Sequence, residues 1–110
     1  MRSNSSQPET PDPGSFSDPP LLVLASLASG PKHGHAMIED IQALSGSRLG
    51  PGTLYGAISR LEHRGWIEAL PMEDRRRPYR LTSAGRAELE ARVSALRRFV
   101  SAGERRLGWA

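Results

Sequence analysis

The order of the apolar patterns along the chain constrains the fold more than any other feature of the sequence. Three consecutive short segments carry apolar residues at helical spacing, and glycine or proline bounds each of them. The first helix is expected over about residues 21–29, after the Pro19-Pro20 pair. The second is expected over about 35–44, and the third over about 51–64 with Pro51 in its first turn.

After Gly65 the spacing changes from helical to that of short strands. Residues 66–70 and 79–81 are expected to pair as a hairpin, whose connector carries three consecutive arginines, residues 75–77. Three helices followed by a hairpin with a basic tip are the layout of a winged helix-turn-helix domain. The predicted fold class is therefore mainly α (α+β), a winged helix-turn-helix with a two-stranded wing and a C-terminal dimerisation helix.

The last predicted helix follows Thr82, which is well placed as its N-cap. The apolar residues of this helix recur at intervals of four and three and so form a heptad-like seam along it. A domain this small has little surface left to cover such a seam. The seam is therefore predicted to pair with a second copy of the chain. Residues 21–82 then form the winged domain and residues 83–110 the dimerisation helix. The residues assigned to the dimer interface are Leu21, Leu24, Leu89, Val93, Leu96, Val100 and Leu107.

The first twenty residues differ in composition from the rest, with five serines and five prolines. Such a segment cannot bury enough apolar surface to offset its ordering entropy, so residues 1–20 are predicted to be a disordered tail. The tail has one basic residue against three acidic ones, and the other ninety residues have fourteen against nine, a net +5. All basic residues except Lys32 are arginine, whose fork of donors suits phosphates and guanine edges. Genome base composition is the alternative source of this arginine content.

Several classes of function are excluded or disfavoured by what the sequence lacks. The chain has no cysteine, which removes disulfides, cysteine nucleophiles and thiolate metal sites. Its longest apolar run, Leu21 to Ala25, is far shorter than the roughly 18 residues of a spanning helix, and no signal-peptide layout is present, so a cytoplasmic location is expected. No nucleophile setting or paired carboxylates are recognisable, so neither an enzyme nor a cofactor is predicted. His33 and His35 lack the further ligands that a metal site needs.

The third predicted helix is the best candidate for contacting DNA. One face carries the apolar stripe, and the opposite face is small, polar and poor in acidic residues, so it can approach another surface closely. In a helix-turn-helix the second helix of the motif enters the major groove with its N-terminal residues first. Double-stranded DNA is therefore the predicted partner. The predicted contacts are Lys32, His33, Gly52, Thr53, Tyr55, Ser59, Arg60, Arg75, Arg76, Arg77 and Arg80.

Several of these residues also have a structural alternative. Thr53 can serve only to stabilise the first helical turn, and Tyr55 can be half core. Arg60 can pair with an acidic residue of its own helix or of the tail, and the wing arginines can be simply solvated. Trp66, which follows the apolar stripe, is expected to anchor the core rather than to bind a ligand.

Four stretches of the sequence together resemble the PadR family of transcriptional regulators. They are residues 27–35 (LASGPKHGH), 49–55 (LGPGTLY), 59–67 (SRLEHRGWI) and 79–86 (YRLTSAGR), so the resemblance covers about residues 21–90. The resemblance implies a dimeric winged-helix repressor that dimerises through its terminal helices. In that family an aromatic or cationic small-molecule effector commonly relieves repression. Phe99 and Trp109 are the candidates for contacting an effector; packing beside the seam and fraying are their alternatives.

The sequence departs from the family pattern at three positions: His35 stands where Tyr is frequent, Gly50 where Ser or Thr is usual, and Gly56 where Pro is usual. Without a hydroxyl at position 50 the third helix loses an N-cap and a phosphate contact, so affinity or sequence preference is expected to differ. Gly56 costs about 1 kcal/mol relative to Ala in an exposed helix interior. This cost is tolerable if the backbone of the third helix must approach DNA closely at Gly56.

Two hypotheses of function follow. The first is a dimeric repressor that binds a palindromic operator, with half-sites about 34–36 Å apart. The alternative is a winged-helix module that binds a protein or a small molecule and has little affinity for DNA. A net charge of +5 is modest, and the acidic tail is long enough to cover a basic face.

Overall fold

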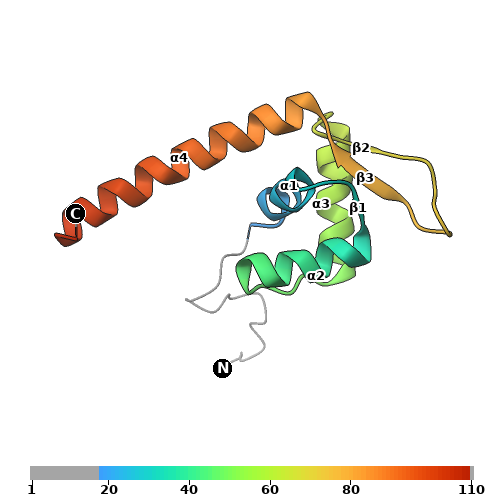
Figure 1. Ribbon diagram of the computed structural model, residues 1–110, viewed down its shortest axis with the longest axis horizontal. Coiled ribbons are helices and arrows are strands. Elements are labelled where there is room, and N and C mark those ends of the chain that lie inside the picture. The colour runs from blue at the N-terminus through green and yellow to red at the C-terminus, as the bar shows by residue number, and fades with distance from the viewer. Residues whose placement is uncertain (1–17, 110) are drawn as a thin grey trace, which may run out of the picture.

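Helix α1 lies at the centre of the structure and contacts α2, α3, α4 and β3 (Figure 1). The computed structural model describes residues 18–109, so the predicted tail lies outside the described residues except for its last three positions. The elements are α1 Pro19–Ala28, β1 Lys32–His33, α2 Gly34–Ser45, α3 Pro51–His63, β2 Ile67–Ala69, β3 Pro78–Leu81 and α4 Ser83–Leu107.

Helix α1 begins two residues earlier than predicted. The sequence predicts a stop at Pro19 and Pro20 before the helix, but both prolines lie in its first turn. Proline fits there because the first backbone N–H groups of a helix have no intrahelical partner. Asp18 caps the turn, and its Oδ1 accepts a hydrogen bond from the backbone N–H of Leu21 (3.3 Å).

Six of the ten residues of α1 are buried, because other elements pack around the helix. Leu21 to Leu24 are at most 6% exposed, and Ser26 is 1% exposed. This corrects one prediction: Leu24 has no exposed surface, so it belongs to the core of its own protomer and not to a dimer interface. Leu21, at 6% exposure, is almost as deeply buried.

The apolar stripes of α2 and α3 form the rest of the core. Met37, Ile38 and Ile41 of α2 are buried. The predicted apolar stripe of α3 is buried too, and consists of Leu54, Ala57, Ile58 and Leu61. Helix α3 is followed, as predicted, by a left-handed glycine, Gly65, with φ +77°. Trp66 is partly buried against this core, as expected. The guanidinium groups of Arg64 and Arg92 lie over its ring, 5.2 and 5.6 Å from the ring centroid.

The wing is part of a three-stranded antiparallel sheet, one strand more than predicted. The order is β1-β3-β2, with His33 opposite Pro78 and Glu68 opposite Arg80. Strand β1 has only two residues and precedes α2 directly, and two residues are too few to show a strand pattern in the sequence. The extra strand ties the wing to the amino end of α2.

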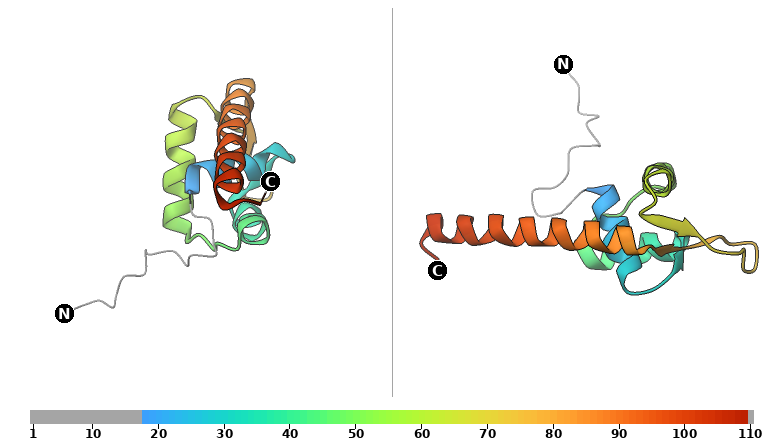
Figure 2. Two further views of the ribbon diagram at one scale, coloured as in Figure 1. Left: turned by 90° about the vertical axis from the view of Figure 1, so that its left-hand side faces the viewer. Right: turned by 90° about the horizontal axis from the view of Figure 1, so that it is seen from above.

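Helix α4 starts against the core and then extends away from it as a single helix (Figures 1 and 2). Thr82 is its N-cap, as predicted, and its Oγ1 accepts the backbone N–H of Gly85 (3.0 Å). The same hydroxyl donates to the carbonyl oxygen of Gly65 (2.7 Å). Gly85 is buried, and a Cβ at this position would collide with the carbonyl oxygen of Trp66. Within the described residues, no helix is both long enough and apolar enough to cross a membrane.

Because α4 approaches the start of β2 closely, a single methyl group added at Gly85 is expected to change the stability of the protein. Gly85→Ala is expected to lower the free energy of unfolding by about 1–3 kcal/mol, because backbone must move to admit the Cβ. Gly56→Ala is the matched control, since a Cβ at Gly56 meets only Arg60 Nη1, at 3.7 Å. It is expected to raise stability by up to about 1 kcal/mol. Urea denaturation measures both, and equal effects at the two positions would refute this packing.

Candidate nucleic-acid interface

Helix α3 presents a polar face opposite its buried stripe. Gly52, Thr53, Ser59 and Arg60 are exposed on it, and Gly56 is half-exposed. The helix begins at Gly50, which provides no side-chain cap, so the first backbone N–H groups lack the partner that Ser or Thr would supply. These groups and the positive end of the helix dipole are available to a phosphate oxygen.

The side chain of Arg60 has no hydrogen-bond or ion-pair partner among the residues that the structure describes. Its Nη1 lies beside Gly56, 3.7 Å from the position of a Cβ there. Gly56 therefore leaves room for the guanidinium to lie close along the helix. The predicted alternative, a pair with Glu62 on the same helix, does not form.

Tyr55 bridges α3 and the start of α2. Its side chain is 49% exposed, and its hydroxyl rests against Gly34, where a Cβ would collide with the phenol. One side of the ring therefore packs against α2, as the half-core alternative predicts, and the other side faces solvent, where DNA contact stays a prediction.

Lys32 and His33 make contacts within the protein that the sequence analysis did not foresee. The Lys32 ammonium donates to the carbonyl oxygen of Ser26 (2.5 Å) and to the hydroxyl of Ser29 (2.7 Å), and lies 3.9 Å from Asp40 Oδ2. His33 is the N-cap of α2, since its Nδ1 accepts the backbone N–H of Ala36 (3.4 Å). Lys32 is thus turned inward, towards α1 and α2. Lysine is not a typical core residue and histidine is not a typical N-cap, so the residue types do not predict these contacts.

The three consecutive arginines of the wing have different surroundings. Arg77 Nη1 donates to the carbonyl oxygen of Leu70 (2.6 Å), and Arg76 Nη1 lies 3.2 Å from His33 Nε2. Arg75 has no such partner within residues 18–109, and it occupies a left-handed backbone conformation with φ +67°. On strand β3, Arg80 is exposed and forms an ion pair with Glu68 of β2.

The wing tip is a two-residue turn. Glu73 and Arg76 exchange two backbone hydrogen bonds of 2.8 Å, and Asp74 and Arg75 between them both have positive φ. This is the hairpin geometry in which Asn-Gly or Asp-Gly is strongly preferred at the two central positions. Asp74 fits the preference at the first central position, whereas Arg75 occupies the second, where glycine is expected.

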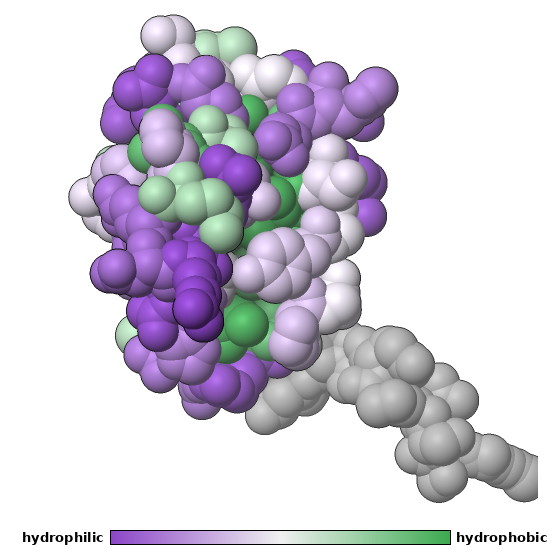
Figure 3. Space-filling view, turned by 90° about the vertical axis from the view of Figure 1, so that its right-hand side faces the viewer, coloured by the Kyte–Doolittle hydropathy of each residue, from purple (hydrophilic) through white to green (hydrophobic). Residues whose placement is uncertain are grey.

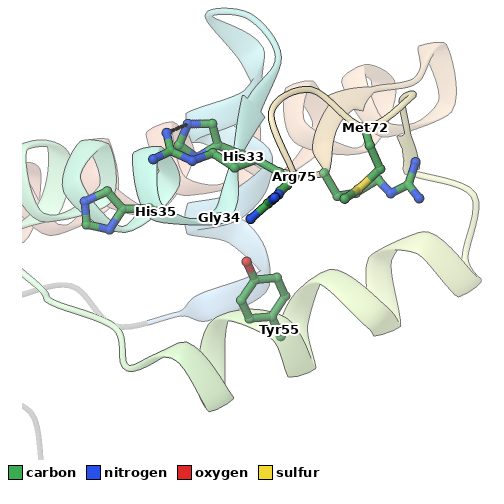
Figure 4. A pocket seen from close by; sticks show the side chains of 8 residues that line it. His33, Gly34, His35, Tyr55, Met72 and Arg75 are labelled. Carbon is green, nitrogen blue, oxygen red and sulfur yellow. Dashed lines mark hydrogen bonds between the residues drawn. The ribbon is translucent and has the colours of Figure 1, made fainter.

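A cleft of about 310 Å³ lies between the wing tip, the start of α2 and α3 (Figure 4). Residues 33–35, Tyr55, Met72 and residues 75–77 line this wing cleft. Three arginines, two histidines and one phenol face it, and no carboxylate belongs to its lining. The surface at this end of the molecule is largely hydrophilic (Figure 3). Of the predicted DNA contacts, the structure therefore brings His33 of β1, Tyr55 of α3 and the three wing arginines to one place.

Tyr79 supports the base of the wing. Its side chain is partly buried against the core. Burial raises the pKa of its phenol above the ordinary value of 10.0, and the Glu62 carboxylate and Tyr55 act in the same direction, while Arg77 opposes them. The hydroxyl of Tyr79 is therefore uncharged at neutral pH.

The predicted dimerisation residues of α4 form an exposed apolar strip. Val93, Leu96 and Val100 are 42%, 40% and 52% exposed, and Leu107 is 62% exposed. Leu89 is partly buried against α1 and the core. A groove of about 300 Å³, lined by α1, the end of α2 and α4, continues this strip. Phe99 and Trp109, the effector candidates, are 73% and 76% exposed.

These features define a winged helix-turn-helix domain with a protruding C-terminal helix. The sequence model of the transcriptional regulator PadR-like family matches residues 23–91. The chain belongs to the PadR-like family of transcriptional regulators.

The chain is also similar to part of a longer protein. An uncharacterized 37.1 kDa protein in transposon TN4556 of Streptomyces fradiae is 47% identical over 81 residues, which cover 74% of this chain and 24% of that protein. The chain thus spans about a quarter of the length of this relative.

Solved structures share the fold. A PadR family transcription regulator from Clostridium difficile superimposes with a TM-score of 0.70 and 22% identity, over 80% of this chain and 95% of that chain. A transcriptional regulator from Clostridium thermocellum gives a TM-score of 0.69 and 23% identity, over 78% and 89%. RosR from H. salinarum superimposes with a TM-score of 0.63 and 22% identity, over 83% of this chain and 80% of that chain.

The contact between Tyr55 and Gly34 predicts a coupled pair of substitutions. Gly34→Ala is expected to lower the free energy of unfolding by about 1–3 kcal/mol, because the new Cβ displaces the phenol. In a Tyr55→Ala background the same substitution is expected to cost less than about 0.5 kcal/mol. A double-mutant cycle by urea denaturation measures the coupling. The same cost in both backgrounds would contradict the contact.

Proposed function

We propose that the protein is a dimeric, sequence-specific DNA-binding repressor. The observation that carries the proposal is the joint placement of the polar α3 face and the arginine-bearing wing tip, with Tyr55 of α3 lining the wing cleft. A duplex with α3 in its major groove would extend its backbone towards that tip. Family membership supports the same role, since the family consists of transcriptional regulators.

In this proposal, α3 reads the bases and the wing holds the backbone. Arg60 is the candidate for a forked contact to guanine, since its guanidinium is exposed and has no partner within the described part of the chain. Thr53 and Ser59 supply hydroxyls to phosphates or base edges. Arg75 and Arg76 lie along the flanking backbone. Lys32 contributes to the interface by fixing β1 to the end of α1 through its hydrogen bonds and to α2 through its ion pair with Asp40.

The second copy of the chain covers the apolar strip of α4 in our proposal. Val93, Leu96 and Val100 expose apolar surface in a continuous row that extends from the groove between α1 and α4. Pairing would remove this surface from water and place two α3 helices on one duplex, which matches a palindromic operator. An effector bound near Phe99 and Trp109 would then act on the spacing of the two halves.

Two measurements on DNA test this function. Selection from a random duplex pool is expected to yield a palindromic site, and the slope of log K against log salt on that site is expected near −7, if a dimer neutralises about eight phosphates. Arg60→Ala is expected to relax preference at one base pair per half-site, by about 1–3 kcal/mol. Arg106→Gln, at the far end of α4, removes the same charge and is the control. Failure to enrich any sequence would refute the proposal.

Placing a charge on the apolar strip tests the dimer. Val100→Asp is expected to give a monomer of unchanged helix content, because Val100 is half-exposed in the protomer and an aspartate there is tolerated only while it stays in water. Ala91→Asp is the matched control, since this exposed alanine lies on the opposite side of α4. Sedimentation equilibrium at micromolar concentration distinguishes the two. A dimeric Val100→Asp protein would show that the strip is not the interface.

A further inference from the structure

We infer that Trp66 is a positioning residue that fixes the direction of α4 relative to α3, and through it the half-site spacing of the operator. The inference rests on the proposed function, in which α4 pairs with a second copy of the chain and α3 enters the major groove. Three observations carry it: the contacts of the Trp66 backbone, the contacts of its ring, and the open space between α1 and the middle of α4.

The backbone of Trp66 joins the end of α3 to the start of α4. Its N–H donates to the carbonyl oxygen of Leu61 (3.0 Å), and its carbonyl oxygen accepts the backbone N–H of Thr82 (3.1 Å). The first turn of α4 packs against the same group, since a Cβ at Gly85 would collide with that carbonyl oxygen. Helix α4 therefore begins directly beside the end of α3, with backbone against backbone (Figure 1).

The ring of Trp66 joins the same two helices through their side chains. The Arg64 guanidinium, at the end of α3, and the Arg92 guanidinium of α4 both lie within the range of cation–π contacts. Arg92 is also held from its own helix, because its Nε donates to Glu88 Oε2 (2.7 Å). The ring thus contacts α4 about two and a half turns after the helix begins. A contact at that distance restrains the direction of the helix as well as its position.

Past this contact, α1 does not fill the space beside α4. Leu89 is partly buried against the core, but Val93 and Leu96 are 42% and 40% exposed. Clefts of about 300 and 260 Å³ lie between α1 and α4, and Leu96 lines both of them. Because α1 packs loosely here, the contact between Trp66 and Arg92 is what restrains the rotation of α4 beyond Leu89 within the protomer.

The length of α4 converts a small rotation into a large displacement. A helix of 25 residues is about 37 Å long, so a rotation of about 10° at its start moves its far end by about 6 Å. That displacement equals nearly two base-pair steps of about 3.4 Å. In a dimer that pairs through α4, the direction of this helix sets the distance between the two α3 helices. The contact at Trp66 therefore sets the half-site spacing that the protein accepts.

Distances between spin labels test the positioning role without DNA. The chain has no cysteine, so His63→Cys on α3 and Arg106→Cys near the end of α4 carry its only thiols. The labelled protein is diluted with an excess of unlabelled protein, so that each measured pair of labels lies in one protomer. With Trp66 in place, we expect one narrow distance distribution.

Substitutions at the ring and at its arginine are expected to change this distribution. Trp66→Leu keeps an apolar side chain and removes the ring face, and is expected to broaden the distribution by about 5 Å or more. Arg92→Met is expected to do the same, and it leaves the buried core intact, so it answers the test even where Trp66→Leu does not fold. An unchanged distribution in Arg92→Met, or in a folded Trp66→Leu protein, would overturn the inference.

Two control variants separate the ring contact from loss of charge and from loss of packing. Trp66→Phe retains an aromatic face for the guanidinium groups. Arg86→Met removes one positive charge from the first turn of α4, where no ring contact is made. Both are expected to keep the narrow distribution. Broadening in Arg86→Met equal to that in Arg92→Met would overturn the role of the ring.

DNA binding at varied half-site spacing tests the consequence for the operator. The two half-sites of the selected site are moved apart one base pair at a time, and each step moves one half-site about 3.4 Å along and about 35° around the duplex. The wild-type protein is expected to lose about tenfold in affinity one base pair away from its preferred spacing. Trp66→Leu and Arg92→Met are expected to lose less than about threefold, because a less restrained α4 lets the two α3 helices follow the half-sites.

The two experiments together distinguish failure of the inference from failure of the proposed function. Broadened label distances with an unaltered spacing preference would overturn the link between Trp66 and the operator. Broadened label distances in a protein that binds no DNA would refute the proposed function and support the positioning role of Trp66 in the fold.

Discussion

The burial of α1 is the constraint on which the rest of the structure depends. Its leucines and Val23 are covered by α2, α3, α4 and β3, so the relative placement of these elements is decided by how they pack around one ten-residue helix. A core this small has no further room for α4, whose second half extends beyond it (Figure 2). The same packing leaves the polar face of α3 in water. Both surfaces to which we assign a function are thus what remains after α1 is covered.

The wing is coupled to the helix-turn-helix through one short segment. Lys32 and His33 form strand β1, pair with β3 and lead directly into α2. Within these two residues, Lys32 hydrogen-bonds the end of α1 and forms an ion pair with Asp40 of α2, and His33 caps α2 while touching Arg76 of the wing. A change in the position of the wing therefore acts on the start of α2, and the wing cleft is the place where the two meet.

Much of the fold and part of the site followed from the sequence. The apolar spacing predicted α2, α3 and α4, and the glycine after α3 and the cap at Thr82 were read correctly, because these signals are local. Strand β1 was missed because two residues carry no period, and the start of α1 was misplaced because proline both ends and begins helices. Leu24 was assigned to the dimer because a sequence shows that a residue is apolar but not which of several apolar surfaces covers it.

By itself, the sequence determined the type and order of the elements, the polar character of the α3 face and the apolar strip of α4, since each depends on residues close together in the chain. The tertiary structure alone decided how residues far apart in the chain combine. It turned Lys32 inward, paired Arg80 with Glu68, and gave three neighbouring arginines three different environments. Contacts such as that between His33 and Arg76 join positions 43 residues apart. The direction of a side chain at such a contact is fixed by the packing of whole elements, which no local pattern contains.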